Sequence, residues 1–275
     1  MARKKQLIIP IFIPFGGCQH KCVFCNQEGI TGEVELPTID EVVEKIESYL
    51  STWKGVGRRE VAFYGGSFTG LDLTLQDTYL GAVQGFIADG RIDSIRLSTR
   101  PDYINEDIVR HLKSFGVKVV ELGVQSFSEE VLRLSGRGHS AEDAELAVEI
   151  LRGLGMEVGL QLMPGLPGDS VERSIESALT ARDLKPDFVR IYPTLVIKDT
   201  PLEGMYKDGT YVPWKLIEMV KLCRRMLDIF NETGIKVVKM GLHPTKDLEA
   251  SIIEGPYHRA FKDLVEGRQV VEGSP

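Results

Sequence analysis

The sequence is poor in cysteine, in net positive charge and in long apolar runs. Its 275 residues include only 4 cysteines, which argues against the disulfide framework of a small secreted domain. The formal net charge of -7 provides no overall positive field that would attract a nucleic acid. No apolar run approaches the roughly 18 residues that a membrane-spanning helix needs, and no signal-peptide pattern precedes the first predicted strand. These absences predict a cytoplasmic protein without a membrane partner.

Short apolar, β-branched runs alternate with segments of helical periodicity. With 43% hydrophobic and 27% charged residues, the chain has the composition of a globular protein that can bury a core. Strands are predicted at residues 6–15, 60–65, 94–99, 117–125, 157–163 and 187–197. Helices are predicted at residues 41–50, 73–87, 104–116, 128–135, 140–155, 170–184 and 212–232. Thr38 with Glu41 has the spacing of a capping box, and Ser140 with Asp143 suggests another helix N-terminus.

Strict alternation of strands and helices predicts a parallel sheet with right-handed crossovers. We expect an α/β fold, a partial TIM barrel of about six β/α units in one domain that covers residues 1–275. The barrel core would span about residues 6–235, and a short strand and helix would form a C-terminal extension over residues 236–275. Active sites of such folds lie at the carboxyl ends of the strands. The unusual loops fall there: GGCQHKC, GGSFTG, STRPD, GVQSF, MPGLPGD and YPT.

Three of the four cysteines lie in the loop after the first predicted strand. Cys18, Cys22 and Cys25 have the spacing C-x3-C-x2-C. A structural zinc site requires four ligands, and the other candidates are only His20, inside the loop, and Cys223, far along the chain and expected in a helical core. A disulfide would leave an odd thiol. An iron–sulfur cluster with three thiolates keeps one iron position open for an outside ligand, so the pattern favours a cluster over zinc.

This cysteine spacing at the end of the first strand of a β/α chain resembles the signature of the radical S-adenosylmethionine (radical SAM) superfamily. The resemblance implies a [4Fe–4S] cluster whose free iron chelates the methionine moiety of S-adenosylmethionine. One electron from the reduced cluster then cleaves a carbon–sulfur bond and leaves a 5'-deoxyadenosyl radical, which abstracts hydrogen from the substrate. An electron donor such as flavodoxin or ferredoxin is implied as a partner.

The resemblance also assigns residues to the S-adenosylmethionine pocket. Phe24 stands at the aromatic position that lies near the adenine in the family. GGSFTG is similar to the glycine-rich motif whose backbone near Gly65 and Gly66 meets the methionine ammonium, and Ser67 stands where many members carry an acidic residue. By motif position, four further side chains would line the pocket: Ser98, Gln125, Arg137 and Gln161.

Longer strings narrow the resemblance to one branch of the superfamily. STRPDYI, ELGVQSF with LSGRGHS, and RIYPTLVIKDTPL are similar to the radical SAM domain of the catalytic subunit of Elongator, a tRNA wobble-uridine modifying enzyme, over roughly residues 7 to 205. GVQSF, RGH and the GLPG run are shared with oxygen-independent coproporphyrinogen oxidases. Ser98 replaces a glutamate common to both groups, and Gln161 replaces the aspartate that holds a ribose in the porphyrin enzymes. Arg137 would suit the methionine carboxylate, because a guanidinium matches carboxylate geometry bidentately.

Polar residues in the same loops are candidate substrate contacts. They are Arg100, Asp102, His139, Tyr192 and Lys198. We expect the substrate to be an RNA base in tRNA, although an acidic chain supplies few Lys and Arg contacts for phosphate. Two alternatives stay open: a tetrapyrrole or other small-molecule radical enzyme resembling coproporphyrinogen oxidase, and a cluster or haem-binding carrier without catalysis. The substitutions at Ser98 and Gln161 keep the carrier open.

The resemblance to Elongator has a limit. That enzyme carries an acetyl-CoA-binding domain after its radical domain, and the residues after the YPTLVI strand are too few for one. We therefore expect no acetyltransferase domain within this sequence. A separate acetyl-CoA-binding protein, or a C-terminal extension, would have to supply that function.

Overall fold

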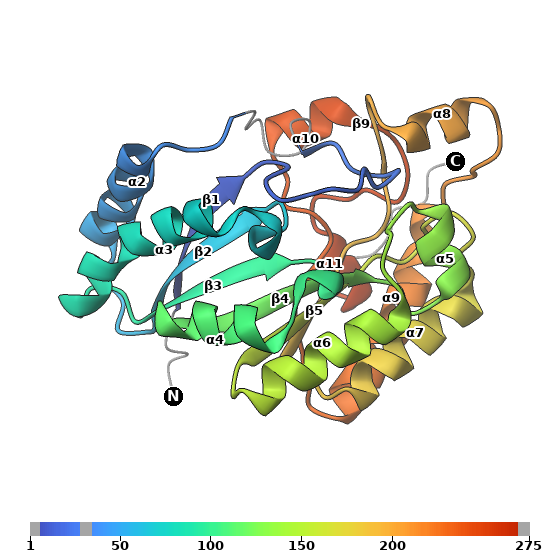
Figure 1. The fold of residues 1–275 in the computed structure, drawn as a ribbon. Coiled ribbons are helices and arrows are strands. Elements are labelled where there is room, and N and C mark those ends of the chain that lie inside the picture. Colours follow the sequence, from blue (N-terminus) through green and yellow to red (C-terminus); the bar gives the residue numbers. More distant parts are fainter. Residues whose placement is uncertain (1–5, 28–34, 269–275) are drawn as a thin grey trace. The chain divides into compact units, whose positions relative to one another are not determined.

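The computed structural model describes residues 6–27 and 35–268, and its ribbon is shown in Figure 1. The strands are β1 (Leu7–Ile13), β2 (Arg59–Gly65), β3 (Ser94–Thr99), β4 (Val117–Gln125), β5 (Glu157–Leu162), β6 (Phe188–Ile191), β7 (Val196–Ile197), β8 (Lys236–Met240) and β9 (Ile252–Glu254). The α-helices are α2 (Ile39–Thr52), α3 (Leu73–Ala88), α4 (Glu106–Ser114), α5 (Glu129–Leu134), α6 (Ala141–Gly153), α7 (Val171–Asp183), α8 (Pro201–Lys207), α9 (Leu216–Glu232), α10 (Lys246–Ser251) and α11 (Phe261–Val265).

Seven strands form the main sheet in the order β1-β2-β3-β4-β5-β6-β8. The pairs β1–β2, β2–β3, β3–β4, β5–β6 and β6–β8 are parallel. Each strand neighbours the next along the chain, as β/α units of a TIM barrel do, so the predicted α/β partial barrel is confirmed. The sheet has one strand more than the six units expected, because the short strand predicted in the C-terminal extension is β8, which pairs with β6.

The chain divides into two compact units. The first contains residues 1–19, 33–122 and 146–158, and the second contains residues 20–32, 123–145 and 159–275. The division falls inside the cysteine loop, so Cys18 belongs to the first unit, whereas Cys22 and Cys25 belong to the second. The expectation of one domain over residues 1–275 stays a prediction.

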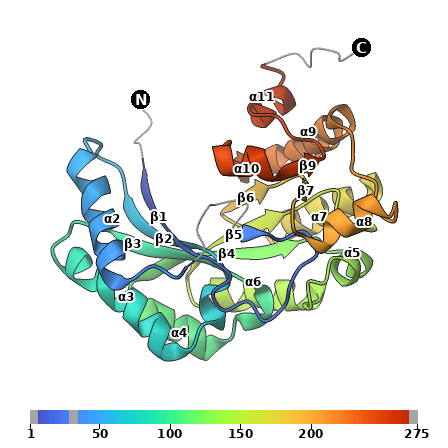
Figure 2. The ribbon, with the colours of Figure 1, turned by 90° about the horizontal axis from the view of Figure 1, so that it is seen from above.

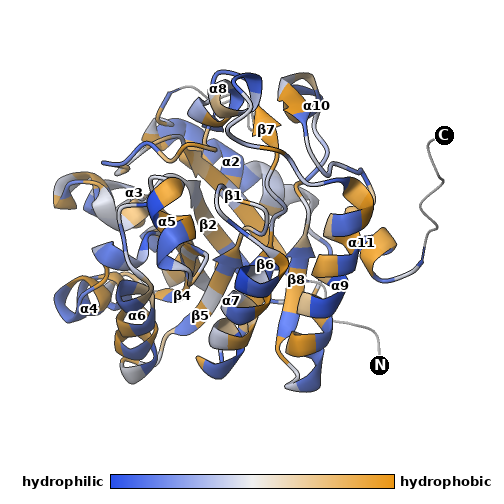
Figure 3. Ribbon diagram, turned by 90° about the vertical axis from the view of Figure 1, so that its right-hand side faces the viewer, coloured by the Kyte–Doolittle hydropathy of each residue, from blue (hydrophilic) through white to orange (hydrophobic). Residues whose placement is uncertain are grey.

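In the first unit, β1 to β3 bury one face beneath helices. Ile9, Ile11 and Ile13 are at most 2% exposed, and β1 is hydrophobic over most of its length (Figure 3). The ring of Phe63 lies 5.1 Å from that of Phe68 and 5.9 Å from that of Tyr79, on α3. Because side chains alternate along a strand, the residues between these apolar positions point to the opposite face of the sheet.

That other face of the first unit carries a buried network of charges. Glu60 is fully buried on β2 and forms ion pairs with Arg58 at 2.9 Å and with Arg96 at 3.0 Å. Arg96 also pairs with Glu121 at 3.2 Å, and the Tyr64 hydroxyl donates to Glu121 at 2.7 Å. Burial acts to lower the pKa of Arg96, but Tyr64, Glu60 and Glu121 outweigh it and raise that pKa. The network therefore keeps the guanidinium charged inside the fold.

The second unit packs helices α7, α9 and α11 beside β6 and β8. Helix α9 alternates hydrophobic and hydrophilic residues (Figure 3), and its buried side includes Met219, Leu222 and Phe230. Cys223 on the same side is 0% exposed, and burial raises the pKa of its thiol. Its position agrees with the predicted role as a core thiol.

The strand predicted over residues 187–197 is wrong in its extent. Strand β6 ends at Ile191, and Pro193 follows, which has no N–H to donate to a neighbouring strand. The chain resumes as the two-residue strand β7, which pairs antiparallel with β9 in a separate small sheet (Figure 2). The single predicted strand is therefore two strands, β6 and β7, with the YPT segment between them.

Local cap signals gave the helix starts correctly where they were recognised. Thr38 and Glu41 form the predicted capping box of α2, and the Ser140 hydroxyl accepts from the Asp143 amide at 3.1 Å. Helices α8 and α10 were not predicted. Both follow a threonine whose side chain caps the helix, Thr200 before Pro201 and Thr245 before α10, so the same signal was present there.

Candidate active site

The glycine-rich loop after β2 packs directly on the chain that follows β1. The Gly66 amide donates to the carbonyl of Ile13 at 2.8 Å, and the Ser67 amide donates to that of Gly16 at 2.7 Å. A β-carbon on Gly66 would lie 2.1 Å from the Gly16 carbonyl oxygen, and one on Gly17 would lie 2.1 Å from that of Ser67. These glycines are therefore required by contact between two backbones.

The same contact brings Ser67 to the first cysteine. The Ser67 hydroxyl oxygen lies 3.4 Å from Cys18 Sγ, and Ser67 is only 3% exposed. A hydroxyl can donate to a thiolate, which a carboxylate at this position could not do. Ser67 stands where many members of the resembled superfamily carry an acidic residue. Here its hydroxyl has a partner inside the protein, Cys18.

Arg100, in the loop after β3, is buried and binds to residues of the same loop. Arg100 is 3% exposed, and its Nε and Nη2 donate to the two carboxylate oxygens of Asp102, both at 2.9 Å. Its guanidinium also lies 5.4 Å from the centre of the Tyr103 ring. Two of the predicted substrate contacts therefore bind each other. Ser98 is half-buried, two positions along β3 from Arg96 and so on the same strand face.

In the second unit, the rest of the cysteine loop lies between two other segments. The Val23 amide donates to the carbonyl of Ser135 at 3.1 Å, and the Leu202 amide donates to that of Val23 at 2.8 Å. A β-carbon on Gly138 would lie 2.7 Å from the His20 ring. The RGH turn and the start of α8 thus fix residues 20–23 from two sides.

Arg137 joins the RGH turn to the second cysteine. Its Nη1 donates to Cys22 Sγ at 3.1 Å, and its Nη2 donates to the carbonyl of Gly123. Arg137 is 6% exposed and Cys22 is 7% exposed, so water is largely excluded from this contact. The family resemblance pairs this arginine with a cofactor carboxylate, whereas the structure places it against a cysteine.

The two predicted glutamines are adjacent. Gln161 Nε2, at the end of β5, donates to Gln125 Oε1 at 3.0 Å. Gln125 has φ of 72°, a left-handed conformation that side chains other than glycine adopt at a cost, and its carbonyl accepts from the Met163 amide at 2.8 Å. This strain is confined to a strand end where the main chain turns into a loop.

Two family descriptions together match most of the chain. Residues 12–180 match the radical SAM superfamily, and residues 186–269 match the radical SAM C-terminal domain. The chain belongs to the radical SAM superfamily. The expectation of a radical SAM enzyme is confirmed at this level.

Known proteins place the chain near one branch of that superfamily. A tRNA uridine(34) acetyltransferase of Methanocaldococcus infernus is 31% identical over 245 residues, which cover 74% of this chain and 46% of the relative. Elongator complex protein 3 of Mus musculus is 28% identical over 203 residues, covering 66% of this chain and 37% of the relative. This chain therefore spans less than half the length of either curated relative.

A solved structure supports the fold. That of archaeal Methanocaldococcus infernus Elp3 with an N-terminal deletion has a TM-score of 0.73 to this chain at 24% identity. The match covers 96% of this chain and 62% of that one. At this identity the likeness establishes the shared fold.

The cysteine loop offers three sulfur atoms, which is the ligand chemistry of an iron–sulfur cluster. None of the three loop cysteines is in a disulfide, and two of them have a polar donor group within reach of sulfur, the Ser67 hydroxyl at Cys18 and the Arg137 guanidinium at Cys22. Thiolate sulfur is the ligand that iron–sulfur clusters take. Over residues 6–27 and 35–268, no three His, Cys, Asp or Glu side chains are grouped as metal ligands. The residues thus fit the cluster by their chemistry.

The remaining predicted site residues of the radical SAM chain have protein partners. His139 Nε2 donates to the carbonyl of Val124 at 3.2 Å, and the Tyr192 hydroxyl accepts from Arg190 at 3.3 Å. Lys198 is exposed and donates to the carbonyl of Ala250 at 2.6 Å. Phe24 packs against the hydrophobic cluster of Val196, Leu202 and Tyr211.

One residue that the sequence analysis missed organises the MPGLPGD loop. Asp169 accepts hydrogen bonds from the Gly165 amide and the Ser174 hydroxyl, at 2.7 and 2.6 Å. Burial raises the pKa of this carboxyl despite those bonds. The Tyr211 hydroxyl donates to the carbonyl of Gly165 at 2.7 Å, and burial raises its pKa as well. An aspartate directly before the N-cap Ser170, at the end of a glycine–proline loop, was the available signal.

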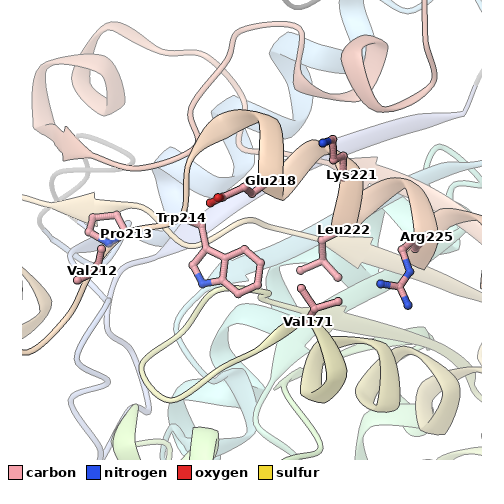
Figure 4. Close-up of a pocket in the computed structure, with 8 residues that line it drawn as sticks. All are labelled: Val171, Val212, Pro213, Trp214, Glu218, Lys221, Leu222 and Arg225. Atoms are coloured by element: carbon pink, nitrogen blue, oxygen red, sulfur yellow. The ribbon is translucent and has the colours of Figure 1, made fainter.

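A hollow of about 520 Å³ opens between the start of α7 and α9 (Figure 4). Trp214, Leu222 and Val171 lie toward one another in it, and charged residues of α9 also line it. None of the predicted site residues lines this hollow. Trp214 nevertheless lies beside the MPGLPGD loop, because a β-carbon on Gly165 would lie 3.5 Å from its ring.

In the part of the chain that the structure describes, no helix has both the length and the apolar character to cross a membrane.

Proposed function

We propose that this radical SAM enzyme holds a [4Fe–4S] cluster through Cys18, Cys22 and Cys25 and uses S-adenosylmethionine to modify a base of tRNA. The observation that carries the proposal is the C-x3-C-x2-C loop directly after β1, none of whose three cysteines is in a disulfide. When bound, the cluster supplies the one electron that splits S-adenosylmethionine into methionine and a 5'-deoxyadenosyl radical. The chain itself has to hold, orient and desolvate these groups.

The residues around the cysteines suit that task. Ser67 and Arg137 offer hydrogen-bond donors to Cys18 and Cys22. The contact of Gly66 with the Gly16 carbonyl fixes where the cysteine loop leaves β1. Gln125 and Gln161 form a neutral amide pair at the strand ends, whose unused donors and acceptors can bind hydroxyl groups such as those of a ribose. We assign the cofactor pocket to these residues together with Phe24, Gly65 and Ser98.

A tRNA substrate is supported by the relatives. The archaeal relative is named for uridine 34 of tRNA, and the mouse relative is an Elongator protein. This chain spans under half of each relative. We therefore propose that any acetyl transfer, for which the archaeal protein is named, is carried out by another domain or by a separate acetyl-CoA-binding protein. The net charge of -7 also means that tRNA binding has to draw on local basic contacts.

The deciding experiment is anaerobic. The protein is reconstituted with iron and sulfide, reduced with dithionite and mixed with S-adenosylmethionine, and 5'-deoxyadenosine is measured with and without total tRNA. We expect cleavage that rises severalfold when tRNA is added. Heat-denatured ribosomal RNA at the same nucleotide concentration is the control for a general polyanion effect.

The other outcomes separate the alternatives. Cleavage that is indifferent to tRNA would remove the tRNA substrate and keep the radical enzyme, which favours a small molecule such as a tetrapyrrole. An intact cluster without cleavage would leave a cluster-binding carrier. A cytoplasmic location and a flavodoxin or ferredoxin as electron donor complete the proposal.

A further inference from the structure

The guanidinium of Arg137 is buried against a sulfur and a carbonyl oxygen. Nη1 contacts Cys22 Sγ at 3.1 Å, Nη2 contacts the Gly123 carbonyl, and the residue is 6% exposed. Its Nε has no hydrogen-bond partner within the described residues. A guanidinium stays charged in proteins, and a buried charge is costly unless a group of opposite sign compensates for it. A carbonyl dipole and a neutral thiol compensate poorly.

A cluster bound at Cys22 would supply the missing compensation, because its sulfur ligands carry negative charge. Thiol sulfur is a weak acceptor, whereas an ionised acceptor roughly doubles the strength of a hydrogen bond from a charged donor. The arrangement therefore suits Cys22 as a cluster ligand better than Cys22 as a free core thiol.

The main chain around Arg137 holds this contact in place. Gly136 and Gly138, on either side, have φ of 63° and 70°, which only glycine adopts without strain. The Ser135 carbonyl accepts from the Val23 amide in the cysteine loop, and Gly138 abuts the His20 ring. The arginine is thus presented to Cys22 by backbone that is itself attached to the cysteine loop.

We propose that Arg137 acts through Cys22 to raise the reduction potential of the cluster, a role that rests on the proposed function. A reduced cluster carries one more negative charge than the oxidised form. A fixed cation and an N–H···S bond stabilise that form more, and hydrogen bonds to sulfur and net charge are among the factors that set such potentials. Arg137 is a positioning residue in this view, in addition to its place in the proposed cofactor pocket.

The test compares Arg137→Gln with Arg133→Gln. Both remove one positive charge from the same stretch of chain, but Arg133 is 68% exposed and pairs with Glu130. Each protein is reconstituted, its iron and sulfide are counted, and the potential of the cluster is measured by a redox titration followed by electron paramagnetic resonance, without S-adenosylmethionine. We expect a full cluster in both variants, a more negative potential for Arg137→Gln, and the wild-type potential for Arg133→Gln.

A second variant keeps the test decisive. Arg137→Lys retains the charge without the planar fork, and its potential should fall between those of the wild type and Arg137→Gln. A wild-type potential in Arg137→Gln would overturn the inference, and a raised KM for S-adenosylmethionine in the same variant would leave Arg137 with a cofactor-binding role only. Loss of the cluster from both Arg137 variants would overturn it too, in favour of a structural brace. A wild-type protein without a cluster would refute the proposed function itself.

Discussion

Gly16 and Gly66 touch through their main chains, so that a β-carbon on Gly66 would meet the Gly16 carbonyl oxygen at 2.1 Å and its nitrogen at 2.6 Å. The two residues belong to the loops that follow β1 and β2, and these strands pair in parallel up to Ile13 and Gly65. The start of the cysteine loop and the glycine-rich loop therefore pack against each other through their main chains.

Gly66→Ala should damage both stability and cluster binding. The new methyl group meets backbone atoms, which cannot rotate away, so we expect a loss of about 2 kcal/mol or more in the free energy of unfolding. Gly81→Ala, on α3, meets no atom within 4 Å and should stabilise the protein by about 0.5–1 kcal/mol. Urea unfolding and iron content measure the two effects. Equal stability of the two variants would contradict the packing described.

Cys22→Ala should abolish the cluster, because each of three thiolates is needed. Iron and acid-labile sulfide after reconstitution should fall to a small fraction of the wild-type amounts, and cleavage of S-adenosylmethionine should be lost. Cys223→Ala is the matched control, since Cys223 is 0% exposed in the core: it should keep the cluster and lose about 1–2 kcal/mol of stability from the cavity. A full complement of iron in Cys22→Ala would refute the three-thiolate site.

Glu60→Gln should destabilise the first unit strongly. The neutral amide cannot compensate Arg58 and Arg96, and removing one member of a buried ion pair costs about 3–5 kcal/mol. Glu47→Gln removes the same charge from the exposed pair with Arg91 and should leave the urea midpoint nearly unchanged. If both substitutions shift the midpoint alike, total charge rather than the buried network controls stability.

Glu249 should make stability depend on pH in acid. Its hydrogen bonds from Arg259 and Tyr257 lower its pKa from 4.5 to about 2. A carboxyl whose pKa is lowered by folding stabilises the protein at pH values above its unfolded-state pKa. This contribution is lost as the pH falls from about 4.5 towards 2. The difference in thermal midpoint between wild type and Glu249→Gln should thus be constant near neutral pH and shrink below pH 4.5. A difference that stays the same down to pH 3 would show that the charge of Glu249 is not responsible.

Some features of the site could be predicted because their signals are local. The spacing of Cys18, Cys22 and Cys25 indicated a cluster, and the capping box of Thr38 and Glu41 gave the start of α2. Others depend on partners far apart in the sequence. The pairing of β7 with β9 joins Val196 to Glu254, and no local pattern in either segment indicates it. The missed helix α8 also had a local signal, Thr200 before Pro201.

The sequence by itself determined the class of fold and the ligands proposed for the cluster, because periodicity and cysteine spacing follow from short-range geometry. Only the tertiary structure decided what each motif residue touches. Arg137 and Cys22 are 115 positions apart, yet their side chains meet at 3.1 Å, while Arg100 binds Asp102 two residues away. Both arginines looked equally available in the sequence. Their partners differ because a buried guanidinium takes whichever acceptor the packed backbone brings within reach, and that packing is a property of the whole fold.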